Sequence, residues 1–217
     1  MSVADTFNFN HGNEIKGMIE SALKKAVSLP IFTVDRDSFL KTELAFYCTP
    51  ETISKSIATS PAEAGVPYET IEKICRSVIK FETNKLAAIS FVSNIPGGVI
   101  GGVMASADVV NYFGSLTRLA MKIAFLHGVR FASLEDNALN EEDINRLIPM
   151  IGVMVGVVEA EKAVVYVMAH CSAKLSKSIS RATLTKTALY PIVKKITGKI
   201  GIRMTKQIYA DVIAGTI

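Results

Sequence analysis

The chain has 217 residues, of which 49% are hydrophobic and 20% are charged, and this length suits one large domain or two small ones. Its mean hydropathy of +0.33 is high for a chain with this charge, which indicates a large buried core or a surface that meets something apolar. The sequence contains no tryptophan and only 7% aromatic residues, a composition that disfavours a stacking platform for single-stranded nucleic acid.

The first third of the sequence predicts a series of helices that begin at recognisable caps. We expect disorder over residues 1–12, followed by a single α-helical domain over residues 13–217. Asp35 suits the N-cap position, and the sequence Thr49-Pro50-Glu51 places a proline at a favoured first helical position. Ser60 and Glu63 have the spacing of a capping box. The apolar residues expected to pack in the helix after Asp35 are Phe39, Leu40, Leu44 and Phe46.

A longer amphipathic helix is predicted to begin after Pro67. Its apolar residues recur at helical spacing, while Glu72, Lys73, Arg76 and Lys80 occupy the opposite side, which is typical of a surface helix. The residues predicted to form its apolar face are Ile71, Ile74, Cys75, Val78 and Ile79.

An uncharged run of 22 residues, 86–107, follows this helix, and this length is sufficient to span a bilayer. A proline and four glycines interrupt it, and they would weaken or break a spanning helix. We therefore predict a Gly-rich hydrophobic helical hairpin, whose turn either packs closely against a neighbour or inserts into a membrane. A phosphate-binding loop is disfavoured because no Gly-Lys-Ser/Thr sequence follows. The turn residues are Pro96, Gly97, Gly98, Gly101 and Gly102.

The next helix is predicted from Met104 to Leu126, with Gly128 at its C-cap. Five polar residues draw a single line along its otherwise apolar surface. We expect the charges on this line to pair with neighbouring helices, for example with Glu159, Glu161 or Lys162. A polar groove, an ion path or a lipid head-group site along the line is the alternative. The line consists of Asp108, Asn111, Ser115, Arg118 and Lys122.

The C-terminal part of the chain is strongly cationic. After a helix capped by Asn140 and kinked at Pro149, ten basic residues and no acidic residue lie between positions 162 and 210, so this segment carries +10 while the rest carries −6. Large aliphatic residues alternate with the lysines, a pattern interrupted at Gly198 and Gly201. We expect the segment to bind anionic lipid, with a solvated or internally neutralised face as the alternative and nucleic acid disfavoured. The binding residues expected are Lys186, Lys194, Lys195, Lys199, Arg203 and Lys206.

Residue types that carry catalysis or bind metals are not arranged for either task. Cys48, Cys75 and Cys171 are far apart in the sequence, and His11 and His127 have no partner at a useful spacing. Neither a metal site nor a nucleophile with a base is predicted. We expect no cofactor, no metal and no enzymatic activity. The first residues also lack the features of a signal peptide, which indicates a cytoplasmic protein.

Several of these stretches resemble the EcsC family of bacterial proteins. The similar segments are Asn94 to Gly98, Ala107 to Val109, Leu116 to Leu119 and Leu126 to Gly128, with flanking similarity at 34–44, 193–196 and 202–206. His127 stands where the family has an aromatic residue, often tyrosine. The resemblance implies an all-α protein associated with an ABC exporter or with secretion, and it implies no catalytic motif.

Together, these observations predict an all-α multi-helix bundle with a non-enzymatic function. The leading hypothesis is a protein peripheral to the inner face of the membrane that supports transport, secretion or an envelope process. Its expected partners are anionic lipids, with a membrane transporter or another protein as a further possibility. One alternative is a soluble helical scaffold that binds a protein partner. The other is an effector that inserts residues 86–107 into a membrane and forms a pore.

Overall fold

A computed structural model describes residues 17, 19–92, 106–131, 139–171 and 186–200. Within these ranges the regular structure is helical, and the predicted all-α bundle is confirmed. The glycine-rich turn predicted at 96–102, the N-terminal residues 1–12 and the basic residues Arg203 and Lys206 lie outside the described residues. A helical segment at 19–27 comes first, and the helices after it are α2 (Arg36–Leu44), α3 (Pro50–Ala58), α4 (Tyr68–Val92), α5 (Ser106–Leu126), α6 (Glu141–Met154), α7 (Glu159–Cys171) and α8 (Lys186–Ile200).

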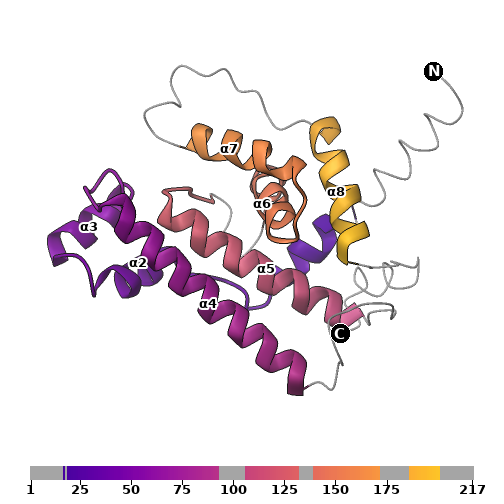
Figure 1. Ribbon diagram of the computed structural model, residues 1–217, viewed down its shortest axis with the longest axis horizontal. Helices are drawn as coiled ribbons and strands as arrows, with labels where there is room; N and C mark the ends of the chain where they lie inside the picture. The colour runs from indigo at the N-terminus through magenta and orange to yellow at the C-terminus, as the bar shows by residue number, and fades with distance from the viewer. Residues whose placement is uncertain (1–16, 18, 93–105, 132–138, 172–185, 201–217) are drawn as a thin grey trace, which may run out of the picture.

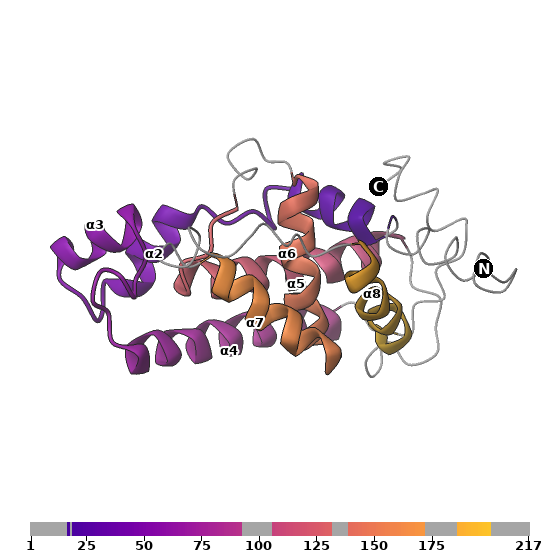
Figure 2. The ribbon, with the colours of Figure 1, turned by 90° about the horizontal axis from the view of Figure 1, so that it is seen from above.

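The two longest helices, α4 and α5, run side by side (Figure 1). They are antiparallel, because α4 residue Cys75 lies near His127 at the end of α5, whereas Glu82, further along α4, lies near Lys122 and Arg118. The remaining helices are arranged around this pair. Helix α2 contacts both α3 and α5. Helix α6 packs on α5 and also contacts α7 and α8 (Figure 2).

The helix caps that were predicted from residues close in the sequence are confirmed. Asp35 accepts a hydrogen bond from the Ser38 amide and Asn140 from that of Asp143, and Thr49, which precedes the predicted Pro50, accepts one from Thr52. Gly128, with φ of 83°, follows the end of α5, where the Val129 amide donates to the Ala124 carbonyl. Helix termini leave such groups unpaired, and these contacts satisfy them.

The capping-box prediction at Ser60 is only partly correct. The Ser60 hydroxyl does accept from the Glu63 amide at 3.3 Å. However, the chain forms only a turn over 61–65, which ends at Gly65 with φ of 91°. A positive φ is incompatible with continuing a right-handed helix, so α4 begins afresh after Pro67.

Two residues predicted to be apolar packing residues are exposed instead. Phe46 is 86% exposed, because α2 ends at Leu44 and the seven-residue spacing that would place Phe46 on the same helical face as Phe39 no longer applies. Ile79 is 45% exposed, at the border of the α4 stripe, whereas Ile71, Ile74, Cys75 and Val78 are buried as predicted. The predicted interruption at Gly198 is also wrong, since α8 continues through it to Ile200.

Candidate functional site

The outer side of α8 is the best described part of the predicted cationic segment. Its apolar side is buried on the other helices, through Leu189, Ile192, Val193 and Ile196. Lys194 and Lys195 are exposed, and we call these two residues the α8 lysine pair. For Lys186 and Lys199, which also belong to α8, only the backbone is described.

Close packing of α6 fixes the position of α8. A Cβ atom added to Gly152 of α6 would lie 2.7 Å from the Cβ of Ala160 in α7 and 3.0 Å from Cγ2 of Ile192 in α8. Glycine is therefore needed for this approach, since real Cβ atoms do not come so close. With its apolar side held in this way, α8 presents Lys194 and Lys195 outward and keeps Leu189, Ile192, Val193 and Ile196 inside.

The α8 lysine pair is only partly neutralised by the protein. The ammonium group of Lys195 forms an ion pair with Glu159 at the start of α7, where both side chains are about half exposed at 52% and 48%. An exposed pair of this kind contributes little to stability. Of the solvated or internally neutralised face predicted as the alternative, Lys195 is thus the neutralised part and the exposed Lys194 the solvated part.

The predicted polar line of α5 divides into an exposed part and a buried part. Asn111 is exposed, Ser115 is half-buried, and of Asp108 only the backbone is described. Arg118 and Lys122 both form ion pairs with Glu82 of α4, with Arg118 Nε 3.4 Å from Oε1 of Glu82. Arg118 thus pairs with a neighbouring helix as expected, but with Glu82 rather than with Glu159, Glu161 or Lys162.

The Glu82 cluster, made of Glu82, Arg118 and Lys122, lies in the interior. Only 5% of the Glu82 side chain and 10% of the Lys122 side chain are exposed. Burial alone would raise the pKa of Glu82, but Lys122 and Arg118 hold that pKa below its ordinary value. Arg118 Nη1 also donates to the carbonyls of Ile31 and Thr33, so the cluster joins α4, α5 and the segment before α2.

Glu82 is not among the predicted site residues, although the sequence contains a signal for its burial. Glu82 follows Val78 by four residues and Cys75 by seven, and this spacing puts its side chain on the buried face of α4.

The rings of two phenylalanines lie near the ammonium group of Lys122. The centroid of the Phe39 ring lies 5.5 Å from Lys122 Nζ, and that of the Phe81 ring lies 5.9 Å from it. These contacts indicate that the buried part of the polar line has a structural role.

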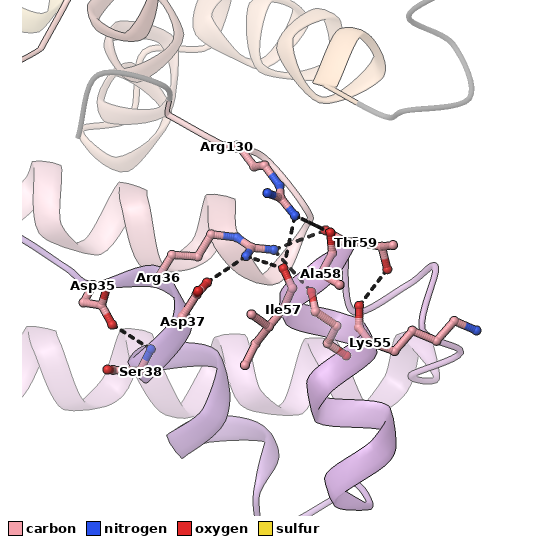
Figure 3. Close-up of polar contacts among 10 residues, drawn as sticks. Asp35, Arg36, Asp37, Ser38, Lys55, Ile57, Ala58, Thr59 and Arg130 are labelled. Carbon is pink, nitrogen blue, oxygen red and sulfur yellow. Dashed lines mark hydrogen bonds and ion pairs between the residues drawn. The ribbon is translucent and has the colours of Figure 1, made fainter. Parts of the chain in front are cut away.

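Two arginines meet at the C-terminal end of α3 (Figure 3). Arg36 donates to the carbonyls of Ser56, Ile57 and Thr59, and Arg130 donates to those of Ile57, Ala58 and Thr59. These carbonyls are unpaired at the helix end and carry its negative dipole. Burial, and then the nearby charge of Arg130, lower the pKa of Arg36. The arginines thus cap α3.

A cysteine and a histidine from distant parts of the chain lie close together. Cys75 Sγ is 3.8 Å from His127 Nε2, a contact that the separation of the two residues in the sequence did not predict. Burial, with a smaller effect of the Glu72 charge, raises the pKa of Cys75 to about 11, and burial lowers the pKa of His127. Both groups are neutral near pH 7, so this is not an activated thiolate with an imidazolium.

We expect the raised pKa of Cys75 to make the protein less stable between about pH 9 and pH 11. In this range the unfolded chain ionises the thiol while the folded state keeps it protonated. Stability is therefore present below the ordinary thiol pKa and is lost as the pH rises towards 11. Urea unfolding midpoints should fall less steeply with pH in Cys75→Ala than in the wild type. Cys48→Ala is the control, and equal slopes in all three proteins would contradict the assignment.

The described helices carry neither a metal site nor a membrane span of the usual kind. No group of three or more His, Cys, Asp or Glu side chains is placed to hold a metal ion among the described residues. None of the helices over the same ranges combines the length and apolar content needed to cross a membrane.

Comparison with known proteins gives no relative. No family model, no curated protein and no solved structure matches this chain.

Proposed function

We propose that this chain is a non-enzymatic, peripheral membrane protein of EcsC type that binds anionic lipid through α8 and supports a transport, secretion or envelope process. The observation that carries the proposal is the α8 lysine pair, exposed on a helix whose aliphatic side is buried on α6 and α7. The EcsC type in this proposal is supported by the resemblance of the sequence to that family.

The packing of α8 specifies the kind of lipid contact. An amphipathic helix that lies in the interface buries its apolar face among acyl chains, but Leu189, Ile192, Val193 and Ile196 are already buried in protein. Binding through α8 is therefore electrostatic, like that of a polybasic segment. Such binding weakens with ionic strength.

Charge reversal at Lys194 tests this function. A basic residue near an anionic membrane contributes about 1 kcal/mol, so Lys194→Glu, which changes the charge by two units, should weaken binding by about 2 kcal/mol, or roughly 30-fold. Lys80→Glu is the matched control, because Lys80 is an exposed lysine of α4. The measurement is co-sedimentation with phosphatidylglycerol-containing vesicles at low and high salt.

The outcomes separate the possible functions. Absence of binding at low salt, or equal weakening by Lys194→Glu and Lys80→Glu, would overturn the proposal. Release of an encapsulated dye from the same vesicles would instead favour the membrane-inserting effector. Binding to a protein partner with no affinity for vesicles would favour the soluble scaffold.

A further inference from the structure

Helix α7 exposes apolar side chains on its outer side. Val165 is 69% exposed, and Val158, which immediately precedes the helix, is 70% exposed. We call these two residues the outer valines of α7.

The packing of α7 on α6 does not require the outer valines. Its inner side is formed by Ala160 and Val167, which are 0% and 3% exposed, and Gly152 of α6 admits Ala160 closely. The sequence from Ala163 to Cys171 contains no Asp, Glu, Lys or Arg. The first turn of α7 exposes Glu159, Glu161 and Lys162, whereas the turn that contains Val165 exposes no charge and is apolar on its packed side as well.

Charges of both signs border the outer valines, because the exposed Glu159 and Glu161 follow Val158 closely in the sequence. Lys162 is exposed and lies between them in the sequence, and the ion pair of Glu159 with Lys195 joins the start of α7 to α8. Figure 1 shows α7 and α8 on the side of α5 opposite to α4. Among the described side chains here, Lys162, Lys194 and Lys195 outnumber Glu159 and Glu161, so the net charge of these five residues is +1. This charge is complementary to an anionic lipid surface.

We infer that the outer valines of α7 enter the head-group region of an anionic bilayer while Lys162 and the α8 lysine pair contact the lipid phosphates. Valine side chains are short, so the insertion is shallow, and the aliphatic stems of the lysines allow their ammonium groups to remain at the phosphate level. The inference rests on the proposed function, to which it adds an apolar contact on α7.

A tryptophan placed in α7 tests the inference directly. The chain has no tryptophan, so Val165→Trp gives a single reporter in the full-length protein. With vesicles of phosphatidylcholine and phosphatidylglycerol, its emission should move to shorter wavelength, and brominated acyl chains should quench it. Tyr68→Trp is the matched control, because Tyr68 is 66% exposed at the start of α4, and its emission should stay unchanged.

A second variant measures the apolar contribution without a new aromatic ring. Val165→Ser should weaken vesicle binding roughly fivefold at constant charge, since it removes apolar surface from the lipid contact. The weakening should persist at high salt, unlike the effect of Lys194→Glu. Thermal unfolding close to that of the wild type would show that the folded state is retained.

The outcomes distinguish this inference from the proposed function. Vesicle binding with unshifted Val165→Trp emission would overturn the role of the outer valines and leave lipid binding by α8 intact. Absence of binding by the wild type would overturn both. A concentration-dependent blue shift without lipid would show that a second copy of the chain covers the valines, and would also overturn the inference.

Discussion

Replacement of Glu82 by glutamine should destabilise the protein by about 3–5 kcal/mol, because it leaves Lys122 as a buried charge without its carboxylate. The Lys122 side chain is 10% exposed and has Glu82 as its ion-pair partner, and solvent cannot replace that partner at this depth. The free energy of unfolding, from urea titration at pH 7, measures the loss.

Two comparisons make this expectation specific. Glu72→Gln makes the same chemical change in an exposed ion pair, with Arg76, whose side chain is 77% exposed; it should cost less than about 1 kcal/mol. The double variant Glu82→Leu/Lys122→Met should be much more stable than Glu82→Gln, since apolar residues can replace a buried pair. Equal losses in Glu82→Gln and Glu72→Gln would contradict the structural role of the Glu82 cluster.

The Glu82 cluster also predicts a loss of stability in acid. The pKa of Glu82 in the folded protein lies below its ordinary value of 4.5. Its contribution to stability is therefore fully present above that value and is lost as the pH falls through the lower, folded-state pKa. Glu82→Gln should accordingly remove part of the acid dependence seen in the wild type.

Replacement of Phe125 by alanine should cost about 3–5 kcal/mol, the usual effect of deleting a fully buried aromatic side chain. Phe125 is 2% exposed, and its ring centroid lies 6.4 Å from that of Phe39 in α2 and 5.8 Å from that of Phe131. The variant would leave a cavity where α5 meets α2. Thermal and urea unfolding both measure the change.

Phe46→Ala is the matched control for Phe125→Ala, because the same atoms are removed from a side chain that is 86% exposed. It should change the free energy of unfolding by no more than about 0.5 kcal/mol. A large loss in Phe46→Ala would mean that Phe46 packs in the folded protein as the sequence pattern first indicated. Similar losses in both variants would contradict the arrangement of α2 against α5.

Features that depend on neighbouring residues could be predicted from the sequence. Asp35, Thr49 and Asn140 cap their helices because a side-chain oxygen reaches an amide only a few positions away, whatever the rest of the fold does. Phe46 shows the limit of this reasoning. Helical spacing assigns a face only while the helix continues, and α2 ends two residues earlier.

Features that depend on packing could not be predicted. The charge of Arg118 on an apolar helix required a partner, but the choice of Glu82 over Glu159 follows from α4 lying beside α5. The sequence pattern predicts a helix with lysines on one side and aliphatic residues on the other, as α8 has. It does not show that the aliphatic side of α8 packs on other helices of the protein. The exposure of the outer valines of α7 has no signal in the sequence, since a sequence does not state which side of a helix is covered.

The arginine cap of α3 has a consequence for the order in which the chain acquires its structure during translation. The carbonyls of residues 57–59 receive hydrogen bonds from Arg130, more than 70 positions later in the chain, and Arg146 of α6 donates in turn to the Arg130 carbonyl at 3.1 Å. When α3 leaves the ribosome, therefore, only Arg36 is available to cap it. The C-terminal end of α3 therefore reaches its final hydrogen bonding only after α5 and Arg130 have been synthesised, and Arg130 gains its own contact with Arg146 only after the start of α6.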